Sequence, residues 1–168
     1  FTTVGNASAN KIVNNMVYDL TSNGTSGLWN VSGINNNGGY GEQYYDNSVS
    51  LTGSLSGSSG TGPSACFANG NGITSAAATN IDVRGNIFSM AGTSGTTAKL
   101  YAHYTTAASY TGSTLDYNDL VATATAPATA VLGFFASTDR TTLALWRTAT
   151  GQEAASLGVA FALEKSDW

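Results

Sequence analysis

Charged side chains are scarce in this chain. They make up 10 % of its 168 residues, against roughly 25 % in an ordinary soluble domain. The six basic residues are scattered and never adjacent, the net charge is −4 and the isoelectric point is about 4.6. Nucleic-acid binding needs clustered basic residues to neutralise phosphates, so it is disfavoured. The same argument disfavours an anionic membrane surface.

Long hydrophobic runs are also lacking. No apolar stretch approaches the ~20 residues that a helix needs to cross a bilayer. The longest candidate, Ala130 to Ala136, has the length of a single strand. We therefore expect no membrane-spanning segment.

Side chains suited to catalysis or metal binding are few. The chain has one histidine, His103, and one cysteine, Cys66. A serine or cysteine nucleophile would have to use His103, and no Gly-x-Ser-x-Gly motif is present. Zinc sites need more such ligands, an intrachain disulfide needs a second cysteine, and no glycine-rich loop has the spacing of a nucleotide site. The expectation is a protein without catalytic residues or a cofactor, with Cys66 as a small buried residue.

Two pairs of acids leave a hydrolytic alternative open. Glu42 and Asp46 flank a Gln-Tyr-Tyr segment, and Asp116 and Asp119 flank Tyr-Asn. Glycoside hydrolysis needs two carboxyl groups facing each other across a cleft. Spacing alone does not show whether either pair does so, and we rank an enzyme below the non-enzymatic readings.

Small and turn-forming residues are abundant. Ser, Thr, Asn and Gly make up nearly half of the chain, while hydrophobic residues still account for 42 %. That fraction is enough for a packed core and argues against wholesale disorder. The chain begins at Phe1 instead of Met, which fits removal of a leader or maturation inside a particle.

Alternation with a period of two dominates the hydrophobic pattern and predicts β-strands. It is clearest from Leu157 to Glu164 and recurs around Val49 and around Val83. The other predicted strands are Met16–Leu20, Leu28–Val31, Leu100–Tyr104, Leu120–Thr125, Ala130–Ala136 and Thr141–Thr148. In the last of these, Trp146 is out of phase with its leucine neighbours, which predicts a strand covered on both faces or a subunit contact.

About nine short strands separated by Gly, Asn and Ser clusters predict an all-β fold. We expect a single antiparallel β-sandwich resembling a jelly roll. Residues 11–168 would form this domain, with 1–10 as an N-terminal arm. Two Ser/Gly/Asn-rich stretches, Asn35–Gly41 and Ser54–Pro63, would be long surface loops. No repeat of 20 to 50 residues is evident, which argues against a solenoid.

Two groups of residues are candidate binding sites. Asp116, Asn118 and Asp119 offer three oxygen-bearing side chains in a predicted loop, and calcium prefers oxygen ligands. They are a weak calcium candidate, because Asx-rich loops more often form turns. The aromatic residues of the N-terminal third lie among amides and glycines, which is the composition of a glycan site. Its members are Trp29, Tyr40, Tyr44 and Tyr45.

Low charge and small polar side chains describe a surface that packs closely against identical copies. The leading hypothesis is a non-enzymatic structural protein on a particle, most plausibly a component that decorates a virion or phage capsid and acts as a homo-oligomer such as a trimer. The first alternative is a subunit of a secreted appendage or adhesin, in which residues 1–10 would add a strand to a neighbour. The second is a carbohydrate-binding module. All three place the protein on a virion surface or outside the cell.

Overall fold

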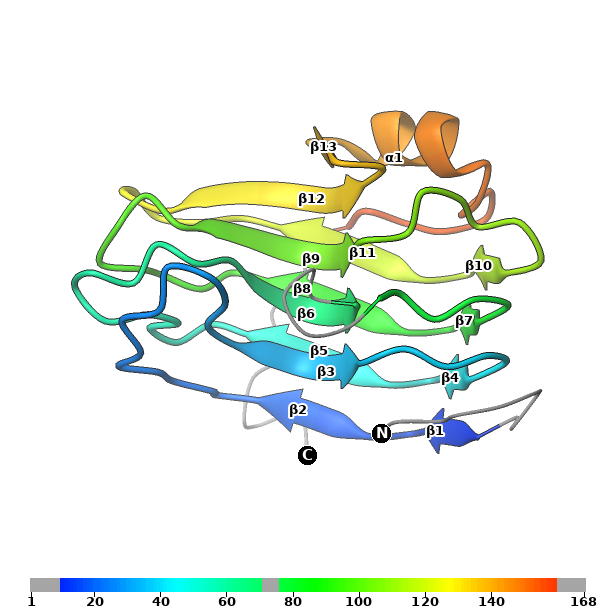
Figure 1. The fold of residues 1–168 in the computed structure, drawn as a ribbon, viewed down its shortest axis with the longest axis horizontal. Coiled ribbons are helices and arrows are strands. Elements are labelled where there is room, and N and C mark those ends of the chain that lie inside the picture. The colour runs from blue at the N-terminus through cyan, green and yellow to red at the C-terminus, as the bar shows by residue number, and fades with distance from the viewer. Residues whose placement is uncertain (1–9, 71–75, 160–168) are drawn as a thin grey trace.

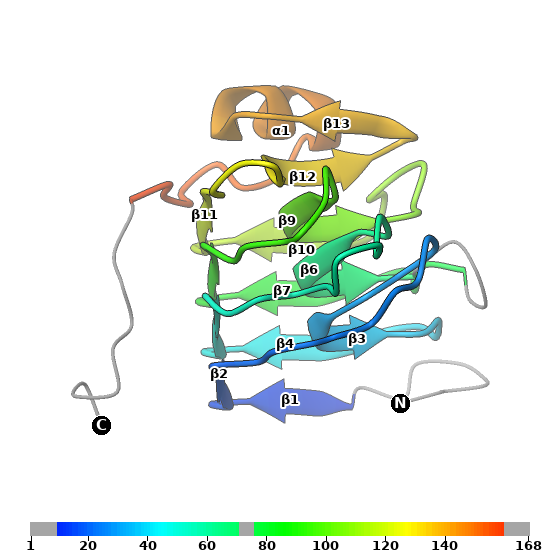
Figure 2. The same cartoon turned by 90° about the vertical axis from the view of Figure 1, so that its left-hand side faces the viewer.

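The chain folds into a parallel β-solenoid. The computed structural model describes residues 10–70 and 76–159. Four turns of chain are stacked on one another, and each turn contributes one strand to each of three parallel sheets, A, B and C. Figure 1 shows the stack rising from the first turn to a helix at the opposite end, and Figure 2 shows it turned by 90°, with sheet A on the side away from the viewer.

The strands are short and evenly distributed over the sheets. Sheet A contains β1 (Lys11–Val13), β4 (Gln43–Tyr45), β7 (Asp82–Arg84) and β10 (Thr114–Asp116). Sheet B contains β2 (Met16–Tyr18), β5 (Ser48–Leu51), β8 (Ile87–Met90) and β11 (Asp119–Ala122). Sheet C contains β3 (Ser32–Asn36), β6 (Ser64–Asn69), β9 (Lys99–Thr105) and β12 (Thr129–Phe135), followed by β13 (Thr138–Arg140). One helix, α1 (Leu143–Thr150), follows β13.

The predicted antiparallel β-sandwich and jelly roll are wrong, although the all-β class is close to what is observed. Alternation reports which residues face the core, but it does not report which strand pairs with which. Each strand here pairs in parallel with the strand one turn further along the chain. The Gly, Asn and Ser clusters between the strands connect strands of different sheets and do not form the hairpins of an antiparallel sandwich. Among the described strands, only β12 and β13 pair antiparallel.

The statement that the sequence has no repeat is also wrong. The corner between sheets A and B recurs in every turn as a residue with positive φ followed by asparagine. The asparagines Asn15, Asn47, Asn86 and Asn118 are separated by 32, 39 and 32 residues. The loops from sheet B to sheet C vary in length, at 19–31, 52–63, 91–98 and 123–128. Because the loops differ in length, they conceal a repeat that is confined to a few residues per turn.

These corner asparagines form a hydrogen-bonded ladder along the solenoid. The Oδ1 atom of Asn86 accepts bonds from the backbone N and the Nδ2 of Asn47 at 3.0 and 2.9 Å. The Oδ1 atom of Asn118 accepts the equivalent bonds from Asn86 at 2.9 and 3.0 Å. The Nδ2 atoms of Asn47, Asn86 and Asn118 each also donate to a backbone carbonyl of the preceding turn. Because an unpaired buried polar group costs about 1–3 kcal/mol, the ladder fixes the stacking of turns.

The core lies between the three sheets and is filled by inward-facing side chains of their strands. Sheet A points Ile12, Tyr44, Val83 and Leu115 inward in one register. Phe67 and Phe88 stack with ring centroids 5.3 Å apart, and Phe67 also contacts the Tyr44 ring at 4.9 Å. Full burial of each such side chain contributes about 1.5–3 kcal/mol. Cys66 is fully buried, as predicted.

Residues 141–148 are helical over most of their length, so the strand predicted there is wrong. The helix α1 begins after Thr142, whose Oγ1 accepts from the Leu145 backbone N, and ends at Gly151 with φ 67°. Trp146 is fully buried beneath it. A Cβ on Gly133 would lie 2.3 Å from the Trp146 ring, so only glycine fits there. The phase of Trp146 thus reflects a helix that closes the C-terminal end of the core.

Other expectations had mixed outcomes. The strands predicted at 16–20, 100–104, 120–125 and 130–136 coincide with β2, β9, β11 and β12. Leu28–Val31 is not a strand, and Leu157 makes only an isolated bridge with Asp119. Residues 160–164 of the predicted C-terminal strand lie outside the described residues, as does nearly all of the predicted arm over 1–10. The domain boundaries at 1–10 and 11–168 stay a prediction.

Candidate functional site

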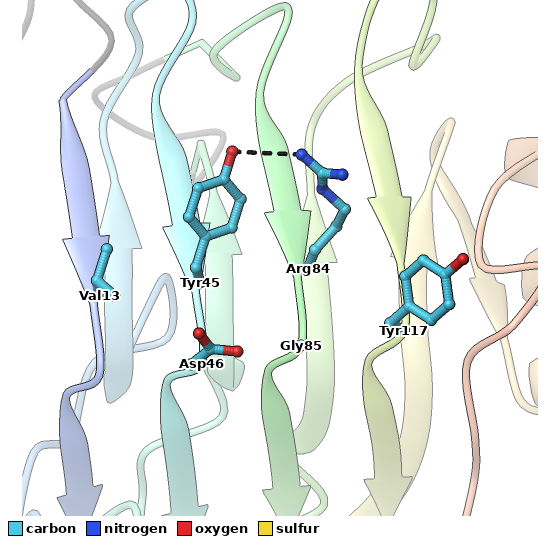
Figure 3. A pocket seen from close by; sticks show the side chains of 6 residues that line it. All are labelled: Val13, Tyr45, Asp46, Arg84, Gly85 and Tyr117. Carbon is cyan, nitrogen blue, oxygen red and sulfur yellow. Dashed lines mark hydrogen bonds between the residues drawn. The ribbon is translucent and has the colours of Figure 1, made fainter.

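A groove lies on the outside of the solenoid at the corner between sheets A and B (Figure 3). It has a volume of about 410 Å³ and crosses several turns of the chain. Its lining residues are Val13, Tyr45, Asp46, Arg84, Gly85 and Tyr117. The first three turns contribute the last residue of their sheet A strand, and the last three turns contribute the corner residue that follows that strand.

The middle of the groove holds a polar cluster on neighbouring strands. Tyr45 and Arg84 are register partners on β4 and β7, and both side chains point outward. The Arg84 Nε donates to Asp82 Oδ1 at 2.6 Å, and the Tyr45 hydroxyl donates to Asp82 Oδ2 at 2.6 Å. The Arg84 guanidinium carbon lies 5.4 Å from the Tyr45 ring centroid. These contacts hold three polar side chains in one arrangement.

The same cluster perturbs the acid–base properties of its members. Partial burial and the hydrogen bond to Asp82 raise the pKa of Tyr45. Hydrogen bonding to Asp82 also raises the pKa of Arg84. Tyr45 therefore stays a neutral hydroxyl and Arg84 a cation at any physiological pH. The cluster therefore offers a neutral hydroxyl and a cation as hydrogen-bonding groups.

Tyr117 occupies an unusual backbone position at the edge of the groove. The corner residues Asn14, Asp46 and Gly85 have φ values of 55°, 54° and 69°, and these residue types tolerate the left-handed region. The fourth corner residue is Tyr117, with φ 57° and 65 % of its surface exposed. Its ring lies on the far side of Gly85 from Asp46 and Tyr45 (Figure 3). Burial does not offset the backbone strain at this tyrosine.

The aromatic residues predicted as a glycan site do not share one surface. Tyr44 is buried in the core with 2 % exposure, whereas Tyr45 next to it faces the corner groove. Tyr40 is exposed and pairs with Thr79 in an isolated bridge. Trp29 lies outside sheet C and donates from Nε1 to Ser32 Oγ at 2.8 Å. Only Tyr45 of the four lines the corner groove.

Trp29 belongs to a second aromatic cluster, on the outer face of sheet C. Its ring contacts that of Tyr104 at 4.8 Å, and Tyr104 stacks on Phe134 at 4.8 Å and 5°. Tyr101 completes the cluster and donates to Asp139 Oδ1 at 2.9 Å. A cleft of about 260 Å³ adjoins these rings. Because the rings pack on one another, this cluster acts mainly as a small hydrophobic core on the outside of the sheet.

The three residues of the predicted calcium site face different directions. Asn118 points inward, where its Oδ1 accepts both bonds from Asn86. The Oδ1 of Asp116 accepts from the backbone N of Ala155 at 2.7 Å, and the Oδ1 of Asp119 accepts from that of Val159 at 3.0 Å. Their oxygens thus bind the backbone and do not converge. Within the described residues, no group of three His, Cys, Asp or Glu side chains could hold a metal ion.

The remaining reactive groups are buried inside the solenoid. His103 is fully buried, its Nε2 lies 2.8 Å from the Tyr110 hydroxyl, and burial lowers its pKa to about 3. Burial raises the pKa of the Cys66 thiol. Burial also raises the pKa of Glu153, whose carboxylate accepts from Asn118 Nδ2 at 3.0 Å and from the Ser156 hydroxyl. His103 thus stays neutral, and Glu153 closes the last rung of the ladder.

The sequence analysis did not find Asp82, Arg84, Gly85 and Tyr117. The signal that would have found them is the alignment of the four corner asparagines. That alignment puts Tyr45, Arg84 and Asp116 in one column and Asp46, Gly85 and Tyr117 in the next. Residues far apart in sequence then become neighbours on one surface.

Comparisons with protein-family models, with curated proteins and with solved structures found no match to this chain. In the part of the chain that the structure describes, no helix is long and apolar enough to cross a membrane.

Proposed function

We propose that this protein is a non-enzymatic structural component of a particle or cell surface. In this proposal the solenoid is a rigid unit that associates with a second copy of itself through its N-terminal end. The observation that carries the proposal is the difference between the two ends of the solenoid. The low charge and small polar side chains of the chain support the surface location, with a virion surface or an extracellular one as the setting.

The N-terminal end presents strand edges. In the described residues, β1, β2 and β3 each pair with one strand only, so each has an outer edge without a strand partner. Val13 and Met16 lie along these edges and are each more than 40 % exposed. A cavity of about 490 Å³ opens between the sheets there, lined by residues that include Ile12, Val17 and Ile34. Open edges with apolar side chains are sites of pairing with another chain.

The C-terminal end is covered. The helix α1 and strand β13 lie over the last turn (Figure 1). The backbone N of Glu153 donates to the carbonyl of Leu115 on β10 at 2.7 Å, and that of Leu120 on β11 donates to Leu157 at 3.0 Å. With one end covered, head-to-tail stacking into an open polymer has no second edge to use. Pairing of like ends about a twofold axis gives a closed assembly instead.

The solution mass of the chain, measured by light scattering coupled to size exclusion, tests this proposal. We expect a discrete dimer that becomes a monomer in Met16→Lys, with an unchanged melting temperature. The matched control is Leu145→Lys, which adds one charge at an exposed apolar position of α1 at the closed end and should leave the dimer intact. A monomeric parent overturns the proposal, and so does a dimer that only Leu145→Lys dissociates.

A further inference from the structure

We propose that the corner groove of Figure 3 binds a neutral saccharide, with Tyr45 and Tyr117 as its aromatic walls and Asp46 and Arg84 as its polar contacts. This inference is independent of how copies of the chain associate. It also differs from the glycan site expected from the sequence, because it keeps only Tyr45 of that group and adds residues from two later turns.

The strongest indication is the choice of tyrosine at the fourth corner. Three corners carry Asn, Asp or Gly, the residues that accept positive φ at low cost. A tyrosine at φ 57° costs stability, and with 65 % exposure its ring recovers little of that cost by burial. Residues whose backbone strain is not offset by burial or packing are concentrated at binding and catalytic sites. The strained backbone therefore holds the Tyr117 ring at the surface of the groove, where a ligand can pack against it.

Glycine at the third corner leaves room for a carboxylate beside that ring. Gly85 lies between Asp46 and Tyr117 in the stack. A Cβ on Gly85 would lie 2.5 Å from Asp46 Oδ1, so the Asp46 carboxylate occupies the place of the missing side chain. The groove of about 410 Å³ that Asp46, Tyr45 and Tyr117 line has room for one ring-shaped group. The groove therefore suits a single sugar ring or the terminal residue of a longer glycan.

The polar groups around the groove are fixed before any ligand arrives. Asp82 holds both the Arg84 guanidinium and the Tyr45 hydroxyl. Side chains that are already ordered lose little conformational entropy on binding. The Asp46 carboxylate adds a hydrogen-bond acceptor in the groove (Figure 3). A polyol that has both donor and acceptor hydroxyls can use an ordered cation and an ordered carboxylate together.

Charge selects a neutral ligand over an acidic one. The one cation of the groove, Arg84, forms an ion pair with Asp82, and Asp46 adds a negative charge. An acidic sugar or a phosphate would face Asp46 with no unpaired cation to balance it. The apolar faces of a sugar ring pack on aromatic rings, and its hydroxyls bond to polar side chains at the rim. A neutral saccharide matches both properties of the groove.

An array of neutral and acidic glycans tests this proposal, followed by titration of a retained glycan. We expect the parent to retain neutral glycans and Tyr117→Asn to bind at least about tenfold more weakly. The same variant relieves the backbone strain, so its melting temperature should be equal to or above that of the parent. Asp46→Asn keeps a residue suited to positive φ and should weaken binding severalfold.

The matched control is Tyr40→Asn, which removes an exposed tyrosine outside the groove and should leave retention unchanged. The proposal is wrong if the parent retains no neutral glycan or retains only acidic ones. It is also wrong if Tyr40→Asn and Tyr117→Asn reduce retention equally. Because Tyr117 lies away from the N-terminal strand edges, the solution mass should be the same in all these variants.

Discussion

The two ends of this solenoid differ in how far the core is covered. Stacked turns always leave a core exposed at each end, and the C-terminal end is closed by Trp146, which contacts His103 with ring centroids 4.8 Å apart. At the N-terminal end, Ile12, Val17 and Ile34 are only partly buried. The comparison teaches that stability is concentrated toward the closed end, whereas the open end keeps apolar surface for contacts with another molecule.

Removal of the tryptophan should have the largest effect on this comparison. Trp146→Ala leaves a cavity above Gly133 and His103, and we expect it to lower the free energy of unfolding by about 3–5 kcal/mol in urea titrations. Leu145→Ala on the exposed side of the same helix is the control and should change stability by less than about 0.5 kcal/mol. A loss below about 1 kcal/mol for Trp146→Ala would contradict the view that this ring holds the closed end.

Lowering the pH should cause the next largest loss of stability, through the closed end. The folded-state pKa of His103 is about 3, below the 6.5 of an exposed histidine, so the unfolded chain takes up a proton first as pH falls. This residue's contribution is complete above pH 6.5 and is lost as pH falls toward 3. From pH 6.5 to 4.5 the loss is about 2 kcal/mol.

Urea titrations at several pH values measure this loss, and His103→Gln should show a flatter decline. Glu153 acts with the opposite sign, because its raised pKa favours the folded state as pH falls toward 4.5. Glu153→Gln should therefore steepen the decline. Identical slopes for the parent and His103→Gln would show that the buried histidine does not control acid unfolding.

The asparagine ladder allows the middle of the solenoid to be compared directly with its open end. We expect the smallest loss of stability here. Asn86→Ala deprives Asn47 and Asn118 of their partners in a buried position, and we expect it to cost about 1–3 kcal/mol. Asn15→Ala removes an exposed rung at the open end and should cost under about 1 kcal/mol. Thermal melts of both variants measure the difference. Equal losses would show that the ladder is no more important in the middle than at its end.

Local composition predicted the class of secondary structure well but could not predict the topology. Around Val49 and Val83 the alternating pattern correctly marked strands, because it depends only on which side chains face the core. Pairing depends on contacts between residues about one turn apart, which a local pattern does not contain. The positive φ followed by asparagine at each corner was the missing signal, and loops of unequal length concealed it.

The candidate site was harder to predict for the same reason. Tyr45, Arg84 and Tyr117 come from three successive turns, so no stretch of sequence contains the groove. The adjacent tyrosines 44 and 45 looked alike in sequence, yet one lies in the core and the other in the groove. A strand places successive side chains on opposite faces.

The ladder has one more consequence, for the length of the molecule. Every rung makes the same contacts with the rung before it, and the C-terminal cover contacts the last turn and, through Trp146, His103 of the third turn. Gain or loss of a whole turn between the ends would therefore leave both ends unaltered, as in other one-dimensional repeat folds. Such a protein lengthens or shortens in steps of about 4.8 Å. Variants with more or fewer turns would therefore differ in the length of the solenoid and keep the same cross-section.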